Sequence, residues 1–356
     1  MTSDVCRCRS LMIIAFFLLP VFFAGEWTQP TSAEEAPPRK VLGRVIPDGA
    51  DPGGLEFVQL FELTGFSGPV YSLDWSPDGT ALASAAYGMI MIWDPITGQV
   101  EAVVRGHQSF VWGVAWSPDG RLLATASSDR TVKLWRPPGY QEVASLDTGS
   151  AMCVAWSPDG QRLAVGTRVG SVSIWDVPSR TIDRQLSGSS LVISADWSGD
   201  GLTLATGDLA GTIALWDPDT GRLLARLDPV AHRSDTNGLT WSPDDTLLAT
   251  AHQDGGVWLW DAHTREPLHT LVAHRGWARG VAFSPDGRLL VTTGENDTAV
   301  VWSTETWEPV ADLRIPPLAM WSASWAPDGS RFAVGSGRYD SLHSGSVYVW
   351  EVLEGS

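Results

Sequence analysis

The sequence WSPDG occupies residues 116–120, and the same five residues stand at 75–79 and 156–160. Close variants follow as WSGDG at 197–201, WSPDD at 241–245, FSPDG at 283–287 and WAPDG at 325–329. The intervals between the leading aromatic residues are 41, 40, 41, 44, 42 and 42. A nearly fixed period of this length is typical of a repeat architecture in which each unit contacts its neighbours. The chain therefore carries seven units.

Each unit contains four short apolar runs, which the second unit illustrates with VWGVAW, RLLATAS, TVKLW and EVASL between residues 111 and 146. Such runs bounded by turn residues are typical of strands. Pro, Asp and Gly suit a tight turn because Pro presets φ and Gly accepts positive φ. A second Trp series closes the units, at Trp93, Trp135, Trp175, Trp216, Trp260, Trp302 and Trp350. The sequence predicts an all-β fold, a seven-bladed β-propeller with four strands in each blade.

Trp-Asp pairs begin at Trp93, Trp175, Trp216 and Trp260, and Gly106 precedes His107. With the WSPDG register, these residues resemble the WD-repeat family over nearly the whole chain after residue 54. The resemblance implies a buried hydrogen-bonded set of a His, a Ser or Thr, an Asp and a Trp within a blade. The matching sets are His107, Thr125, Asp129 and Trp135; His232, Thr250, Asp254 and Trp260; and His274, Thr292, Asn296 and Trp302.

These sets contain the residue types of a catalytic triad, but we interpret them as structural. A catalytic set would occur once, whereas these recur from blade to blade, with Asn296 standing where the family has Asp. Each internal hydrogen bond would contribute about 1 kcal/mol to stability. The first, third, fourth and seventh units have lost the His and most of the polar partners.

Residues 57–63, FVQLFEL, precede the first WSPDG and belong to no complete unit. An open ring would expose two sheet edges. We therefore expect this N-terminal strand to close the last blade, as its outer strand. The propeller is then expected to span residues 55–352, followed by a tail at 353–356.

The N-terminus has the features of a targeting segment. Arg7 and Arg9 precede the apolar run LMIIAFFLLPVFFA, whose 14 residues are fewer than the roughly 20 that a membrane-spanning helix needs. We expect residues 1–33 to be a signal peptide cleaved after Ala24 or Ala33, with an uncleaved membrane anchor as the alternative. Residues 34–54, rich in Pro, Gly and Glu, are expected to form a flexible linker. Either way the protein is predicted to be exported, to the periplasm or outside the cell.

Composition excludes several classes of function. The net charge of -17 opposes the phosphate neutralisation on which nucleic-acid binding depends. We expect no catalytic residues, no metal and no cofactor, because neither paired acids nor a His cluster is expected at the channel and no glycine-rich loop opens a helix. Cys153 would be the remaining cysteine of the cleaved chain, and its apolar surroundings suit a buried thiol. A closed ring has no free edge, which favours a monomer.

Two positions in each unit are expected to border the channel mouth, because the resemblance places the loop before the first strand and the start of that strand there. These positions are unusually aromatic, and the predicted partner-binding residues among them are Tyr71, Phe110, Trp112, Trp277, Arg279 and Trp321. Trp and Arg are frequent binding hot spots. We predict that they bind a protein or peptide segment, the alternative being that the rings pack against neighbouring blades and fill the channel.

The predicted function is a non-catalytic interaction scaffold in the cell envelope or outside the cell. The seventh unit adds a longer stretch, GSGRYDSLHSGS at 335–346, which we interpret as a specificity element because loops often carry function. Fold does not decide function, so two alternatives stay open. One is a propeller enzyme, a hydrolase or lyase acting on a small molecule in the channel. The other is a periplasmic translocation-associated propeller, although its repeats typically do not end the third strand in Trp-Asp.

Overall fold

The computed structural model describes residues 43–45, 54–188, 190–227, 234–315, 318–338 and 345–354. The predicted signal peptide or anchor at 1–33 and most of the linker lie outside these residues. The chain divides into residues 1–35 and 36–356, and the second unit is described here. Every regular element among its described residues is a β-strand. Among the described residues, no helix is long and apolar enough to cross a membrane.

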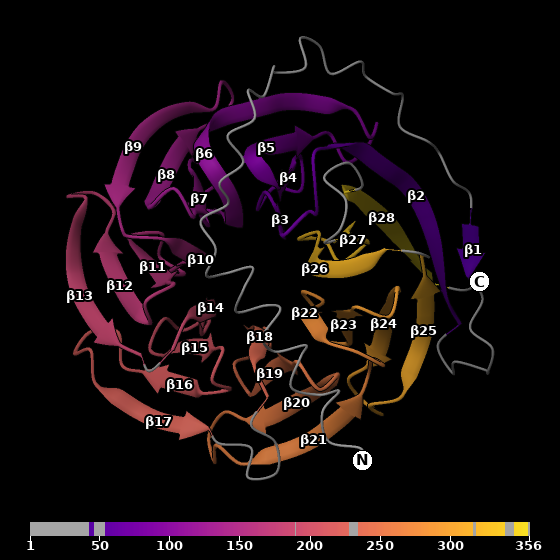
Figure 1. Cartoon of the computed structure of the whole chain (residues 1–356). Coiled ribbons are helices and arrows are strands. Elements are labelled where there is room, and N and C mark those ends of the chain that lie inside the picture. Colours follow the sequence, from indigo (N-terminus) through magenta and orange to yellow (C-terminus); the bar gives the residue numbers. More distant parts are fainter. Residues whose placement is uncertain are drawn as a thin grey trace, which may run out of the picture. The chain divides into compact units, whose positions relative to one another are not determined.

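Apart from β1, the described strands form seven sets of four, because the long strand β6 contributes to two of them (Figure 1). Blade one contains β3 (Ser72–Trp75), β4 (Leu82–Ala85), β5 (Tyr87–Trp93) and the first part of β6 (Val100–Trp116); blade two contains the rest of β6, β7 (Leu123–Ser127), β8 (Thr131–Arg136) and β9 (Gln141–Asp147). Blade three contains β10 (Ala151–Trp156), β11 (Arg162–Thr167), β12 (Ser171–Asp176) and β13 (Thr181–Ser187).

Blade four contains β14 (Val192–Trp197), β15 (Leu204–Asp208), β16 (Ile213–Trp216) and β17 (Leu223–Leu227); blade five contains β18 (Thr236–Trp241), β19 (Leu247–His252), β20 (Gly256–Asp261) and β21 (Pro267–Val272). Blade six contains β22 (Ala278–Phe283), β23 (Leu289–Gly294), β24 (Thr298–Ser303) and β25 (Pro309–Arg314); blade seven contains β26 (Ala319–Trp325), β27 (Arg331–Gly337), β28 (Gly345–Glu354) and β2 (Leu55–Phe66). All these pairings are antiparallel, so the prediction of an all-β propeller is confirmed.

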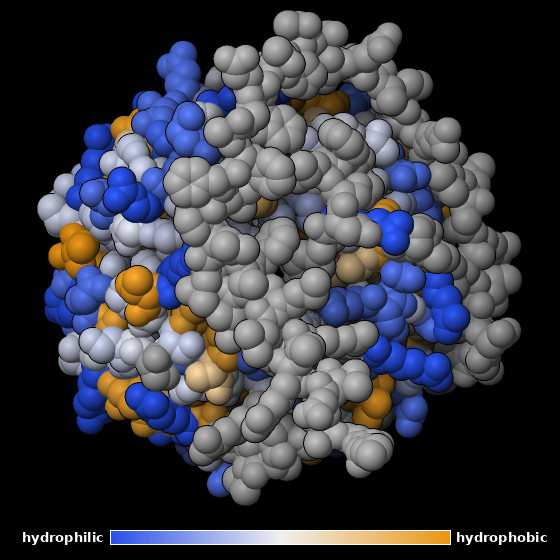
Figure 2. Space-filling model, in the orientation of Figure 1, coloured by the Kyte–Doolittle hydropathy of each residue, from blue (hydrophilic) through white to orange (hydrophobic). Residues whose placement is uncertain are grey.

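The first strand of each blade is the innermost, and each of these strands contacts the first strand of the next blade. The contacts run from β3 through β6, β10, β14, β18, β22 and β26 and return to β3. The core lies between successive blades, where the apolar clusters join residues of two neighbouring sheets. Around the outer strands, hydrophilic and hydrophobic side chains are interspersed on the face that Figure 2 shows.

The pairing of β2 with β28 agrees with the expectation that residues 57–63 supply the outer strand of blade seven. The two strands run antiparallel, with Phe57 opposite Val352 and Leu63 opposite Val347. Alternate residues of β2 are buried, and Phe57 and Leu63 are fully enclosed. Within the predicted linker, residues 43–45 form the short strand β1 (Gly43–Val45), which pairs with the outer edge of β2.

The first Trp series joins neighbouring blades. The indole Nε1 of Trp156 donates to the carbonyl of Ala115 at 3.0 Å, and that of Trp75 donates to Ser324 at 3.2 Å, across the junction of blades seven and one. A buried indole needs a hydrogen-bond partner, and the backbone of the preceding innermost strand provides it. The Trp before the turn is therefore a link between blades as well as a core residue at five of the seven positions, whereas Trp116 Nε1 has no partner among the described residues and Phe283 has no N–H to donate.

The turns after the innermost strands interlock around the ring. A Cβ on the turn glycine of one blade would lie in ordinary contact with the turn proline of the preceding blade, as Gly120 does with Pro77 and Gly79 with Pro327. Blades four and five depart from this pattern together. Blade four has Gly199 in place of Pro, and the carboxylate of Asp245 in blade five accepts the N–H groups of Gly199 at 2.6 Å and Asp200 at 2.9 Å. Because proline has no N–H to donate, this contact requires both Gly199 in blade four and Asp245 in blade five.

We expect Gly199→Pro to be destabilising in the parent and stabilising in an Asp245→Gly background. In the parent it removes an N–H donor beside a carboxylate, at a cost of about 1–3 kcal/mol. With glycine at 245 the turn matches the other blades, and Asp245 no longer has to hold a positive φ of 58°. A double-mutant cycle by urea denaturation measures the coupling. Additive effects would contradict this account.

Candidate functional site

The structure brings together two of the sets that the resemblance implies. His107 places Nδ1 2.8 Å from Asp129 Oδ2 and Nε2 2.7 Å from Thr125 Oγ1, and Trp135 Nε1 donates to the same hydroxyl at 2.9 Å. In blade six, His274 contacts Asn296 at 2.9 Å and Thr292 at 3.0 Å, and Trp302 donates to Thr292 at 3.0 Å. The Asn amide oxygen thus takes the place of the Asp carboxylate.

Burial decides the charge of these imidazoles. It lowers the pKa of His107 despite the neighbouring Asp129, and it lowers the pKa of His274 to about 4. The pKa of Asp129 falls to about 2 because hydrogen bonds from Thr131, Gln108 and His107 outweigh burial. Both imidazoles are therefore neutral links between strands at pH 7, in keeping with a structural role.

The predicted set of blade five is described only in part, because His232 lies outside the described residues. A second imidazole contacts Thr250 here: His252 places Nε2 2.8 Å from the hydroxyl. Trp260 Nε1 donates to Thr250 at 2.9 Å, as expected. The main-chain N–H of Asp254 donates to Ser234 Oγ at 2.9 Å. The side chain of His252 reaches Thr250 because alternate residues of one strand share a face, a contact that the sequence analysis overlooked.

The polar set is incomplete where the sequence lacks its hydroxyl. Trp175 Nε1 and Trp350 Nε1 are buried and have no partner among the described residues. The second-strand position that holds Thr125 in blade two holds Val165 in blade three and Val334 in blade seven. Blade one retains part of the set, since Trp93 Nε1 donates to Ser84 Oγ at 2.8 Å.

The six predicted binding residues form one continuous cluster, which we call the aromatic mouth: Tyr71, Phe110, Trp112, Trp277, Arg279 and Trp321. All six are half-buried. The ring of Tyr71 lies 4.5 Å from that of Trp112 and 5.3 Å from that of Trp321, measured between centroids. Phe110 stacks on Trp112 at 5.4 Å. The cluster spans four consecutive blades, from six through seven and one to two.

Arg279 lies between two indoles. Its Cζ is 4.4 Å from the ring centroid of Trp277 and 4.4 Å from that of Trp321. Glu295 Oε1 accepts a hydrogen bond from Nη2 at 2.6 Å. Cation–π contacts stabilise a structure more when the cation is shielded from water. The Arg279 side chain is only 11% exposed. The guanidinium is thus a fixed part of the wall, which joins Trp277 to the rest of the aromatic mouth.

Two of the three indole N–H groups of the aromatic mouth already donate hydrogen bonds within the protein. Trp112 Nε1 donates to Ser128 Oγ at 2.6 Å, and Trp321 Nε1 donates to the Gly337 carbonyl at 3.2 Å. These bonds fix the orientation of the rings. What the two indoles can offer a ligand is therefore the surface of the ring, which suits apolar or planar groups.

Two side chains of this region were missed by the sequence analysis. Tyr87, which is 44% exposed, extends the cluster at 4.8 Å from Phe110, and Glu295 holds Arg279. Both lie outside the two positions counted in each repeat. Asp235 stands in the fifth unit at the position that Phe110 and Trp277 hold in theirs, and burial raises its pKa to about 6 against the opposing charge of Arg279.

Two acidic residues occupy the position before the Trp in the innermost strand. Asp74 Oδ2 accepts the N–H of Trp116 at 2.6 Å, and Asp196 Oδ2 accepts that of Trp241 at 3.0 Å. Each carboxylate thus binds an edge amide of a neighbouring innermost strand. Burial raises the pKa of Asp74 to about 7 and that of Asp196 to about 6.

Other predicted features give no chemical site in the part of the chain that the structure describes. Cys153 is buried, and burial raises the pKa of its thiol to about 12. Among the described residues, no three His, Cys, Asp or Glu side chains are placed to hold a metal ion. Residues 339–344, the middle of the long stretch of blade seven, lie outside the described residues.

Comparison with known families agrees with this architecture. Residues 69–230 match the family model described as the IFT122 first beta-propeller. Residues 221–261 and 265–303 match the model described as WD domain, G-beta repeat. No curated protein matches the chain significantly. The two family models together extend over most of the blades, and the chain belongs to the WD-repeat β-propellers.

Proposed function

We propose that this protein is an exported, non-catalytic scaffold that binds a protein or peptide segment at the aromatic mouth. WD-repeat propellers are typically scaffolds that bind proteins. The observation that supports the finer proposal is the unbroken contact from Trp277 through Arg279, Trp321 and Tyr71 to Trp112. Export rests on the apolar run before residue 25 and stays a proposal.

The composition of the aromatic mouth favours a partner over a reacting substrate. Most of its side chains are aromatic, and its one cation is paired with Glu295. Aromatic side chains that bury large areas at low entropic cost are typical of binding surfaces. Since the indole N–H groups of Trp112 and Trp321 are already bonded, we expect a peptide to contribute apolar or aromatic side chains that stack on the rings.

The test is selection of binding peptides from a random library displayed on phage, followed by titration of the selected peptides against variants. Trp277→Ala and Phe110→Ala are expected to weaken binding about thirtyfold each, the loss for a hot spot of roughly 2 kcal/mol. Leu268→Ala is the matched control, because Leu268 is 48% exposed on the outer strand β21. Peptides that bind both mouth variants as tightly as the parent would contradict the proposal, and so would a failure to select any peptide.

A further inference from the structure

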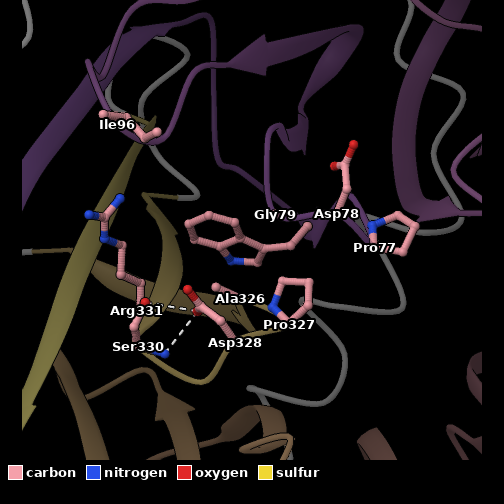
Figure 3. A pocket seen from close by; sticks show the side chains of 10 residues that line it. Pro77, Asp78, Gly79, Ile96, Ala326, Pro327, Asp328, Ser330 and Arg331 are labelled. Carbon is pink, nitrogen blue, oxygen red and sulfur yellow. Dashed lines mark hydrogen bonds between the residues drawn. The ribbon is translucent and has the colours of Figure 1, made fainter.

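A second candidate site lies at the other end of the innermost strands, where the turns of blades seven and one meet. This pocket has a volume of about 420 Å³, within the range of roughly 300–1,000 Å³ for small-molecule sites. It is lined by Trp75, Pro77, Ile96, Pro327, Asp328 and Arg331, among others. In Figure 3, Arg331 and Ile96 lie on one side of the pocket, and Pro77 and Asp78 on the other.

The guanidinium of Arg331 is half-buried, but not all of its N–H groups have a hydrogen-bond partner among the described residues. Its Nη1 donates to the carbonyl of Pro95 at 3.1 Å, and its Nη2 lies 3.6 Å from Glu351. Its Nε is buried and has no partner among the residues that the structure describes. The side chain is 24% exposed. A partly desolvated guanidinium binds a carboxylate strongly when two parallel N–H groups can donate, whereas Glu351 lies too far from Arg331 for a hydrogen bond.

The junction of blades three and four shows which chemical group can pair with an arginine at this position. Arg162 stands at the position of Arg331, just after the turn of its blade, and its Nη1 donates to Asp219 Oδ1 at 2.6 Å. Its Cζ lies 5.0 Å from the ring centroid of Trp197, which is the counterpart of Trp75. A carboxylate of the next blade therefore completes this junction.

The two junctions differ by one side chain. The turn WDPDTG at 216–221 supplies Asp219, and the turn WDPITG at 93–98 has Ile96 at the same place. The turns share their hydrogen bonds, since Asp94 accepts the N–H of Ile96 and Asp217 accepts that of Asp219. Ile96 is 72% exposed and lines the pocket. At the junction of blades seven and one, Arg331 thus faces the exposed apolar side chain of Ile96. At the junction of blades three and four, Arg162 forms an ion pair with Asp219 instead.

We propose that this pocket binds the carboxylate of a small apolar acid. The carboxylate pairs with Arg331 as Asp219 pairs with Arg162, and the apolar body lies against Ile96 and Trp75. The same chemistry is offered by a free alkyl acid and by the C-terminal residue of a peptide.

The acidic residues of the pocket do not prevent this binding. Asp328 accepts hydrogen bonds from the N–H and hydroxyl of Ser330 within its own turn, and Asp78 is engaged in the same way by Ser76 and Thr80. Their counterparts, Asp159 and Asp200, occupy the turns beside the Arg162–Asp219 pair. A carboxylate is therefore accommodated next to two such turns elsewhere in the same ring.

The experiment titrates the full chain with hexanoate, with hexanamide and with an acetylated tripeptide ending in a free leucine carboxylate, observed by ligand NMR. We expect one of the two carboxylates to bind and hexanamide to bind at least about tenfold more weakly. Hexanoate binding identifies a free acid as the ligand, and tripeptide binding alone identifies a peptide C-terminus. If neither carboxylate binds, or if hexanamide binds equally well, the proposal is overturned.

Two pairs of variants assign the site. Arg331→Gln and Ile96→Asp are expected to abolish binding, the second because it rebuilds the ion pair of the other junction, while Arg162→Gln leaves binding unchanged. Asp219→Ile should create a second site and raise the stoichiometry from one to two. Retained binding in folded Ile96→Asp would refute the assignment. Since these residues lie apart from the aromatic mouth, loss of peptide binding there would not affect this result.

Discussion

Removal of residues 56–64 is expected to abolish the cooperative unfolding transition of the propeller. The deletion removes Phe57, Phe61 and Leu63, which are 0%, 8% and 0% exposed, and it leaves the edge of β28 without its partner. Loss of each large buried side chain costs about 2–5 kcal/mol. The summed cost for the three side chains is comparable to the free energy of unfolding of a whole domain, which is roughly 5–15 kcal/mol. Circular dichroism during heating measures the transition.

Deletion of residues 43–45 is the matched control, because β1 pairs only with the outer edge of β2. We expect it to change the melting temperature little. A synthetic peptide of residues 54–67 should restore the transition when it is added to the 56–64 deletion variant. A deletion variant that melts like the parent would show that the β2–β28 pairing does not hold the ring together.

Replacement of Asp74 by Asn is expected to stabilise the protein at pH 8. Burial raises the pKa of Asp74 to about 7, and the charge of Asp196 adds to the rise. In the unfolded chain the same carboxyl has a pKa near 3.8. The folded state therefore binds more protons between these pH values, and stability falls as the pH rises from about 4 to about 7. Each pKa unit corresponds to about 1.4 kcal/mol, so the full cost of ionisation is about 4 kcal/mol.

The gain for Asp74→Asn should be about 2–4 kcal/mol at pH 8, because the amide oxygen still accepts the N–H of Trp116 without bearing a charge. It should vanish near pH 4, where Asp74 is protonated in the folded state. Asp196→Asn is a graded comparison with a smaller gain, since the pKa of Asp196 rises only to about 6. Urea denaturation between pH 4 and pH 8 measures both. A destabilised Asp74→Asn variant at pH 8 would mean that the carboxylate is held in its charged form.

The repeating features of the chain were predictable from its residues alone. The period of the WSPDG turn, the two Trp series and the His107 set are local patterns that recur, so each blade repeats the evidence of the others. The same count predicted that residues 57–63 form an additional strand, because they belonged to none of the seven units. The incomplete sets of blades three and seven were visible as missing hydroxyls.

Features that depend on contacts between blades were not predictable in the same way. The sequence analysis placed Tyr71 and Trp321 at one face, but their contact joins residues of blades one and seven. Some contacts within a blade also escaped prediction. Glu295 was missed because it lies in the turn after β23, outside the repeated positions, and the pairing of β22 with β23 brings it beside Arg279. His252 was set aside because only the strand geometry brings it to Thr250.

By itself, the sequence determined the repeat, the kind of regular element and the His107 and His274 sets within blades two and six, because those interactions lie within about forty residues and are encoded by local periodicity. Only the tertiary structure decided which junctions differ. The Gly199–Asp245 contact and the pairing of Arg162 with Asp219 each join separate blades, as does the contact of Arg331 with Pro95. Such contacts depend on the packing of one blade against another, which brings side chains from different repeats together and so makes one junction an ion pair and another an open pocket.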